Sequence, residues 1–303
     1  MRSLLIVVML LAIVPAASAC DVCGCSIGGN YFGILPQFHK HFVGLRWSEQ
    51  SFRSTHSLSS AENGIYDSEE HFQTIDLIGR FYPARRVQVL VLVPYHNFHR
   101  GETGVQTNSQ GLGDVSLMGN YILINSGDSL RQRLRHTLTV GGGLKLPTGR
   151  FVSKNQEGEL LHENLQPGSG SMDFMLSATY TLRRGYWGLS SDIIGRINTA
   201  NKNGYHFGNR VSTSAKVFYV KNFSKVTLLP NLGLFTDLSD VSYNGNRYMQ
   251  ETGGTAVLST IGLDAYFGKF SIGYTIQLPV FEDMAGGLVQ NRFRSMATLN
   301  YNF

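Results

Sequence analysis

The sequence predicts an all-β protein, an antiparallel transmembrane β-barrel of about twelve strands with its N- and C-termini in the periplasm. Three observations lead to this fold class. Apolar and polar residues alternate along most of the chain, the connections between the alternating stretches are short and long in turn, and an export signal is combined with a C-terminal Phe303. Side chains of a strand point to opposite faces with a period of two, so this alternation gives each strand one apolar and one polar face.

Residues 1–19 are predicted to be a signal peptide. Arg2 precedes the apolar run 4–14, and small residues at Ala17, Ser18 and Ala19 form a cleavage site. No stretch reaches the ~18 apolar residues of a transmembrane helix. Mean hydropathy is −0.08, which suits a barrel because only alternate residues face lipid. We therefore expect the chain to be located in the bacterial outer membrane.

Residues 38–303 are predicted to form the barrel. Most alternating stretches exceed the ~9–11 residues that a tilted strand needs to cross a bilayer. In the stretch 270–282, for example, one face carries Phe270, Ile272, Tyr274, Ile276 and Leu278. The stretches are 38–53, 70–83, 86–99, 111–125, 132–148, 169–183, 186–200, 205–221, 224–237, 252–267, 270–282 and 289–303. Ten or fourteen strands remain alternatives.

A soluble β-sandwich also alternates, but two further features favour a membrane barrel. The connections 83–85, 125–131, 184–185, 221–223 and 268–269 are short, whereas 54–69, 100–110, 149–168, 201–204, 238–251 and 283–288 are mostly longer. Short periplasmic turns and long outer loops are typical of outer-membrane barrels. Aromatic residues also cluster near strand ends, as in interface girdles: Trp47, Phe81, Tyr82, Tyr180, Trp187, Phe218, Tyr219, Phe267 and Phe270.

The first and last strands are expected to pair. An open sheet edge in hydrocarbon would leave a row of backbone groups without partners. The terminal residues 299–303 alternate and end on Phe303, which resembles the C-terminal signal for insertion of barrels. Outer-membrane lipid and the barrel-insertion machinery are therefore the expected partners.

The polar faces predict a charged lumen. Two interpretations remain open: a mutually satisfied ionic network in a narrow barrel, or a polar path with a selectivity element. Glycines within 111–113 and 141–143 would let the wall bend or a segment pack inside. The residues expected to face the lumen are Arg46, Asp76, Arg80, Asp114, Lys145, Asp173, Asp192, Arg196, Arg210, Lys216, Asp264, Arg292 and Arg294.

Two motifs carry a resemblance to a known family. Residues 111–121 read GLGDVSLMGNY and residues 141–151 read GGGLKLPTGRF. They resemble the family named MetA-pathway of phenol degradation, in which a G-x-G-D strand start precedes a strand that ends in K-x-P-T-G. The resemblance covers roughly residues 70–303, and it implies a barrel that passes small, hydrophobic or aromatic molecules.

Residues 20–37 are rich in cysteine and glycine, and we interpret them as a periplasmic segment or as a plug of the barrel. Cys20, Cys23 and Cys25 form a C-x2-C-x-C motif that would suit Cu(I) or Zn(II), with His39 and His41 as further candidate ligands. Cys20 directly follows the cleavage site, so a lipid anchor is an alternative, as is a disulfide in the oxidising periplasm. An absence of any role also remains open.

No catalytic residues are predicted, because the chain lacks the G-x-S-x-G, H-E-x-x-H and P-loop patterns. The net charge of +5 without a basic run argues against a nucleic-acid partner. The expected function is that of a channel or transporter for small molecules, hydrophobic, aromatic or linked to a metal. The alternative is a non-conducting barrel with a metal-binding or lipid-anchored cysteine segment.

Overall fold

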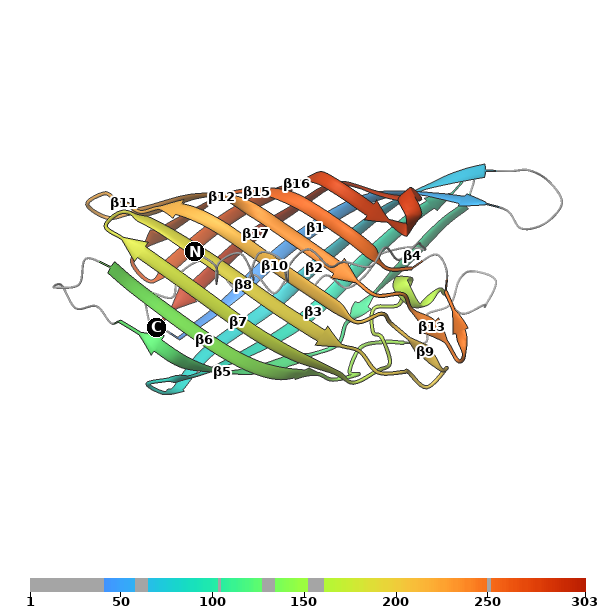
Figure 1. Cartoon of the computed structure of the whole chain (residues 1–303), viewed down its shortest axis with the longest axis horizontal. Coiled ribbons are helices and arrows are strands. Elements are labelled where there is room, and N and C mark those ends of the chain that lie inside the picture. Colours follow the sequence, from blue (N-terminus) through green and yellow to red (C-terminus); the bar gives the residue numbers. More distant parts are fainter. Residues whose placement is uncertain (1–40, 58–64, 103–104, 127–133, 152–160, 250–251) are drawn as a thin grey trace, which may run out of the picture.

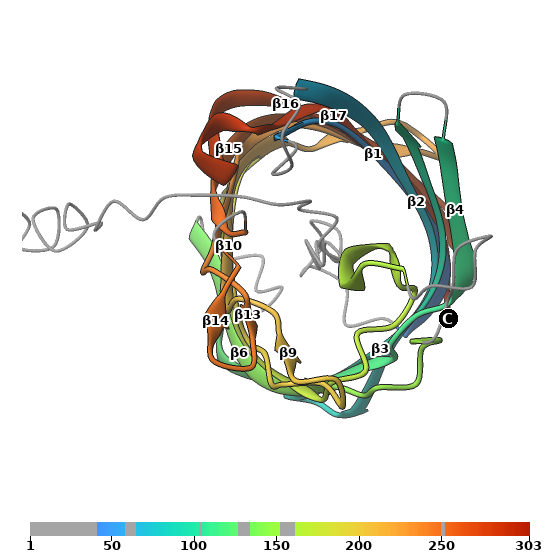
Figure 2. The ribbon, with the colours of Figure 1, turned by 90° about the vertical axis from the view of Figure 1, so that its right-hand side faces the viewer.

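The computed structural model describes residues 41–57, 65–102, 105–126, 134–151, 161–249 and 252–303. These residues form a closed antiparallel β-barrel whose wall has twelve strand positions (Figure 1, Figure 2). The predicted fold class is confirmed. Residues 1–37, for which a signal peptide and a cysteine segment are predicted, lie outside the described residues.

The wall strands follow one another around the barrel in chain order. They are β1 (Phe42–Ser57), β2 (Ile65–Ala84), β3 (Val87–Glu102), β4 (Val105–Leu112) with β5 (Ser116–Asn125), β6 (Leu134–Lys145), β7 (Asp173–Arg184), β8 (Trp187–Ile197), β10 (Arg210–Tyr219), β12 (Thr227–Ser239), β15 (Gly254–Phe267), β16 (Phe270–Met284) and β17 (Val289–Asn302). Short strands outside this sequence are β9 (Tyr205–His206), β11 (Lys221–Asn222), β13 (Tyr243–Asn244) and β14 (Arg247–Tyr248).

The barrel closes where β1 pairs with β17. The register runs from Phe42 opposite Asn302 to Ser54 opposite Val289, with one irregularity after Ser51. This pairing leaves the first and last strands without a free edge, as backbone groups in hydrocarbon require.

An apolar belt covers the outside of the wall. It is formed by residues that alternate with the inward-facing side chains, and the ten named next are 37–62% exposed. They include Leu45, Leu77, Leu117, Leu144, Leu176, Ile193, Leu232, Ile261, Tyr274 and Leu278. Such a belt is what a β-barrel presents to lipid.

The two ends of the barrel differ as predicted. At the short-turn end, β7 and β8 are joined by two residues, 185–186, and β15 and β16 by 268–269. The chain terminus lies at this end, where the Phe303 N–H donates to the His41 carbonyl at 3.0 Å. Exposed aromatic residues gather here, including Trp187, whose ring lies 5.0 Å from that of Tyr219. Phe218 does not belong to this girdle, because it is buried with Val220 and Leu229.

At the long-loop end, the prediction of a loop at 100–110 is wrong. β3 continues to Glu102 and pairs with the whole of β4, from Val105 to Leu112. The outer face of β4 is polar, with Gln106, Asn108 and Gln110 exposed. Apolar alternation therefore stops while the strand continues, so hydrophobic periodicity does not reveal it.

The interior is partly apolar, which differs from the uniformly polar lumen that alternation suggests. Buried clusters line it at Phe42, Ile78 and Leu92 and at Leu90, Met118 and Met175. The described helices are two single 3-10 turns, η1 (Glu163–Leu165) and η2 (Ala285–Gly287). No helix in the described part of the chain is long and apolar enough to cross a membrane.

Candidate functional site

Part of the connection between β6 and β7 folds into the barrel. We call its residues 161–172 the inner loop. Figure 2 shows its yellow-green turn, η1, inside the ring of strands. Leu161, Asn164, Leu165 and Gln166 are buried. The expectation that 149–168 is an outward polar loop is therefore wrong for its described part, because this segment carries apolar side chains that pack against the inner wall.

Asp114 holds both sides of this connection. It lies between β4 and β5, where the wall strand is interrupted, and it accepts hydrogen bonds from Gly149 N and from Ser169 N, each at 2.9 Å. The Ser169 hydroxyl donates to the same carboxylate at 2.6 Å. Hydrogen bonds to a buried carboxylate are charge-assisted and stronger than neutral ones.

Lys145, at the end of β6, completes this group of contacts. We call Asp114, Lys145, Gly149, Ser169 and Asp173 the anchor of the inner loop. Its ammonium lies 2.9 Å from the Asp114 carboxylate and 2.6 Å from that of Asp173, and it also contacts Ser169. The three charged side chains are each at most 7% exposed. Burial of this cation requires such paired carboxylates.

Glycine permits the close approach of the two chain segments. A Cβ at Gly149 would lie 2.7 Å from the Cα of Gly168 and 2.7 Å from the carbonyl carbon of Gly113. A Cβ at Gly168 would lie 2.7 Å from the Cα of Gly149. Any side chain at these two positions would separate the backbones and weaken the anchor.

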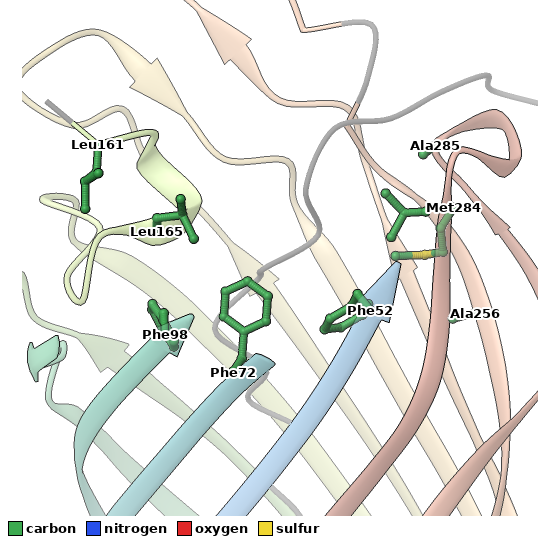
Figure 3. Close-up of a cluster of buried hydrophobic side chains, with 9 residues drawn as sticks. Phe52, Phe72, Phe98, Leu161, Leu165, Ala256, Met284 and Ala285 are labelled. Atoms are coloured by element: carbon green, nitrogen blue, oxygen red, sulfur yellow. The ribbon is translucent and has the colours of Figure 1, made fainter. Parts of the chain in front are cut away.

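An apolar cluster supports the inner loop from the wall. Phe72 contacts Phe52 and Phe98, with ring centroids 5.7 and 4.9 Å apart. Leu161 and Leu165 belong to the same buried cluster (Figure 3). Burial of a leucine contributes about 1.5–3 kcal/mol, so the inner loop is fixed by packing as well as by charge.

A cavity of about 110 Å³ remains beside the inner loop. Phe72, Leu92, Pro94 and Phe98 form an apolar side of its lining. Its charged lining among the described residues is balanced in number: Arg46, Lys145, Arg196 and Arg210 against Asp76, Asp114, Glu163 and Asp173. The cavity thus offers both an apolar face and charged groups to a solute.

Further ion pairs line the lumen. Arg46 Nε donates to Asp76 at 2.8 Å, and Arg210 lies 3.5 Å from Asp237. The sequence prediction did not include Asp237, although this residue alternates with the outward-facing residues of β12. His96 was also missed, and its Nδ1 lies 2.8 Å from the Thr74 hydroxyl. A strand-by-strand parity count would have found both residues.

The predicted lumen residues differ in their placement. Those that are buried are Arg46, Asp76, Arg80, Asp114, Lys145, Asp173, Arg210, Lys216, Asp264 and Arg294. Asp192 and Arg196 are half-buried and line cavities. Arg292 departs from the prediction, because it is exposed. Phe52 pairs with Asn291 and Ser51 with Phe293, which leaves Arg292 at a bulge where the strict alternation of faces is lost.

The candidate metal ligands are mostly outside the described residues: Cys20, Cys23, Cys25 and His39. His41 lies at the short-turn end, where its Nδ1 accepts a hydrogen bond from Tyr82 N at 3.2 Å and its ring stacks on Phe303 at 5.6 Å. Among the described residues, no group of three or more His, Cys, Asp or Glu side chains is arranged to hold a metal ion.

The fold is similar to that of solved outer-membrane proteins. No protein-family model and no curated protein matches the chain. The COG4313 outer membrane channel from Pseudomonas putida F1 superposes with a TM-score of 0.66 at 12% identity, over 91% of this chain and 99% of that one.

Two further barrels superpose less well. The β-domain of the Bordetella autotransporter Brka has a TM-score of 0.44 at 13% identity, over 87% of this chain and 99% of that one. LpxR from Salmonella typhimurium has a TM-score of 0.41 at 9% identity, over 86% of this chain and 100% of that one. Of these three proteins, only the channel superposes with a TM-score above 0.5, and at 12% identity the similarity is one of fold.

The closed wall and the similarity to the channel identify the fold. The apolar outer belt indicates that this fold lies in a membrane. The chain is a bacterial outer-membrane β-barrel, with charged and apolar groups in its lumen and a loop folded into it.

Proposed function

We propose that the chain is an outer-membrane channel for small solutes, narrowed by the inner loop. The observation that carries the proposal is a charged cavity inside a closed barrel, bounded on one side by Glu163, Asn164 and residues 166–169 of that loop. A loop that folds inward and is held by charge reduces the cross-section of the lumen. The similarity in fold to an outer membrane channel supports the same function.

Planar-bilayer recording of the refolded, full-length protein tests this proposal. We expect discrete conductance steps from the wild type, and larger steps from a variant with a released inner loop, such as Asp114→Asn. Electrical silence of both proteins, while both migrate as folded barrels in unheated gel samples, would contradict channel function.

We further propose that the solutes have an apolar or aromatic face. The apolar side of the cavity, with Phe72, Leu92 and Phe98, supports this substrate class, as does the resemblance to the phenol-degradation family at residues 111–121 and 141–151. Phenol and glycerol are suitable probes for block of the ionic current. Equal block by both at equal concentration would argue against selection for aromatic solutes.

We also propose an orientation of the barrel in the outer membrane. Short turns are periplasmic in outer-membrane barrels, so we place the short-turn end and the C-terminus in the periplasm. The inner loop then lies inside the barrel at its extracellular end. Labelling of a single cysteine introduced at the exposed Asn246, in a chain whose native cysteines are replaced by serine, tests this on intact cells. Labelling only after the outer membrane is permeabilised would reverse the orientation.

A second candidate function rests on the three cysteines within residues 20–25. We propose metal binding by Cys20, Cys23 and Cys25 on the same barrel, with lipidation of Cys20 and a disulfide as the alternatives. Metal analysis of protein loaded with Cu(I) or Zn(II), with and without the three cysteines, tests it. Intact-mass measurement of the mature chain separates the lipid and disulfide outcomes.

A further inference from the structure

Exposed basic residues gather at the short-turn end of the barrel, which is the left-hand end in Figure 1. Two of them stand in the turn between β2 and β3, and one ends β7. Two more lie between β10 and β12, and one stands in the turn between β15 and β16. We call this set the basic rim. Its members are Arg85, Arg86, Arg184, Lys221, Lys225 and Lys269.

In the described part of the chain, no acidic side chain is exposed at this end. The described acidic residue nearest to a short turn along the chain is Asp264 of β15, which is buried in the lumen and accepts a hydrogen bond from Asn231. The sequence between β5 and β6 contains two arginines and one aspartate, so it does not reverse the sign. The short-turn end therefore presents a positive surface to its surroundings.

The long-loop end differs, because residues of both signs are exposed there. Arg53 forms an ion pair with Asp67 and stands opposite Glu69 in the register of β1 and β2. Other exposed charged residues at this end are Arg150, Lys202, Asp240, Arg247, Asp283 and Arg292. The positive surface at the short turns is thus a local feature, and the net charge of the chain does not account for it.

Arg184 shows how the basic rim meets the apolar belt. It lies on the same face of β7 as Leu176, a member of the belt, and it pairs with Trp187 across the turn between β7 and β8. Trp187 in turn pairs with Tyr219 of β10, and Lys221 follows two residues later. Two exposed cations therefore flank an exposed tryptophan at the edge of the lipid-facing surface.

The same combination of a cation and an aromatic ring occurs at two other turns. Lys269 Nζ donates to the Tyr301 hydroxyl at 3.4 Å and lies 5.7 Å from the centroid of that ring. Phe223 is exposed between Lys221 and Lys225. The basic rim and the aromatic girdle at this end consequently occupy the same level of the barrel.

This level corresponds to the headgroups of the membrane. Aromatic rings of interface girdles lie at the depth of the lipid headgroups, and lysine and arginine side chains extend along apolar surface to bring their charges to the same depth. Cations close to a membrane are attracted to anionic lipids over about one Debye length. The positions of these cations therefore suit contact with headgroup phosphates.

We propose that the basic rim binds the phosphate groups of anionic phospholipids, such as phosphatidylglycerol, around the short-turn end. The surface lies on the outside of the wall, so binding is independent of the lumen and of the proposed channel function. The proposed orientation determines only which leaflet supplies the lipid. Arg184 and Lys221 form the part of the rim that can be tested most directly, because Trp187 lies between them.

Quenching of tryptophan fluorescence by brominated lipid measures binding at this place. The chain has two tryptophans, so Trp47→Phe leaves Trp187 as the single reporter. The full-length protein with this substitution is refolded into phosphatidylcholine vesicles that contain brominated phosphatidylglycerol or brominated phosphatidylcholine. The test variant adds Arg184→Gln and Lys221→Gln. The matched control adds Lys202→Gln and Arg247→Gln, which remove two exposed cations from the long-loop end.

We expect phosphatidylglycerol to associate beside Trp187 roughly fivefold more strongly than phosphatidylcholine. The control should keep this preference, and the test variant should lose most of it. Because both lipids are compared on one protein, a change in the intrinsic fluorescence of Trp187 does not affect the ratio. Equal quenching by the two lipids in the Trp47→Phe protein overturns the proposal, as does an unchanged preference in a test variant that migrates as a folded barrel.

An arm with inorganic phosphate distinguishes lipid from free anion. A preference that disappears on addition of sodium phosphate, but persists in sodium chloride of equal ionic strength, would assign the basic rim to free phosphate and overturn binding of lipid. Persistence of the preference in both salts supports the proposal. A barrel that is electrically silent in planar bilayers and still prefers phosphatidylglycerol would contradict only the channel function.

Discussion

The carboxylate of Asp114 lies 2.9 Å from the ammonium of Lys145, although the two residues stand in separate motifs of the sequence. Asp114 belongs to the G-x-G-D motif and Lys145 to the K-x-P-T-G motif. The structure explains both patterns physically. The aspartate accepts the backbone N–H of Gly149, the last residue of the second motif, and Thr148 Oγ1 accepts a hydrogen bond from Val115 N at 2.9 Å. The two motifs together build the anchor of the inner loop.

Replacement of Asp114 by asparagine is expected to release the inner loop. The amide keeps the shape of the side chain but removes the charge that Lys145 and the Ser169 N–H and hydroxyl recognise. Asp173 remains as a partner of Lys145, so we expect a loss of about 1–3 kcal/mol in the free energy of unfolding rather than the full cost of an unpaired buried charge. Urea denaturation in detergent measures it.

The matched control for this variant is Glu69→Gln, which neutralises an exposed carboxylate on β2. It is expected to leave the free energy of unfolding within about 0.5 kcal/mol of the wild-type value. Equal destabilisation by the two substitutions would show that net charge, and not the anchor, determines the effect.

Alanine at Gly168 is expected to separate the two segments that the anchor joins. The added methyl group would lie 2.7 Å from the Cα of Gly149, which requires a backbone shift, and such overpacking costs about 1–3 kcal/mol. Gly119→Ala is the control, because nothing lies within 4 Å of a Cβ built at Gly119. Thermal unfolding followed by circular dichroism compares them. Similar unfolding temperatures for both variants would refute the close-approach argument.

Truncation of Leu165 to alanine tests the apolar support of the inner loop. Leu165 is 4% exposed and packs in the cluster that contains Phe72 and Phe98. Loss of a buried leucine costs about 2–5 kcal/mol when the site cannot collapse. We expect lower stability and more current noise in bilayer recordings, because the loop is held less firmly. Leu134→Ala at a 48% exposed position is the control, and unchanged noise in Leu165→Ala would count against the docked loop.

The wall was predictable from the sequence, because an alternation of period two is a local signal. The stretch 270–282, for example, corresponds to β16 at Phe270–Met284. The pairing of β1 with β17 followed from the need to satisfy backbone groups in lipid. Residues 100–110 were assigned wrongly, since above the belt both faces of a strand can be polar.

The candidate site was only partly predictable. Alternation predicts that Asp114 and Lys145 face the lumen. It does not predict the partners of Asp114, which are Gly149 and Ser169 on the long connection between β6 and β7. The direction in which a connection folds depends on tertiary contacts, here those of Leu161 and Leu165 with the aromatic cluster. Arg292 was misplaced because a bulge shifts the faces, and a bulge leaves no mark in the periodicity.

Arginine at Ile261 is expected to destabilise the barrel in the membrane. Ile261 is 57% exposed at the middle of β15, between Leu232 and Ile276 on the neighbouring strands. A charged side chain on the lipid face near the midplane costs about 2–4 kcal/mol, and close to nothing beyond the interface. Gln106→Arg on the polar outer face of β4 is the control. Unfolding titrations in lipid vesicles measure the difference, and equal costs would contradict the assigned belt.

Valine at Gly44 is expected to disturb closure of the barrel. Gly44 lies on β1 opposite Asn300 of β17, and a Cβ there would contact the Asn300 side chain and lie 2.9 Å from the Leu299 carbonyl oxygen. The side chain of asparagine can move, but the carbonyl belongs to the seam that joins the first and last strands. Gly195→Val is the control, because nothing lies within 4 Å of a Cβ built there. Folding into vesicles, scored by gel mobility without heating, should fall in Gly44→Val and persist in Gly195→Val. Equal folding yields would mean that the seam tolerates a bulky residue, and that closure does not depend on close approach at this position.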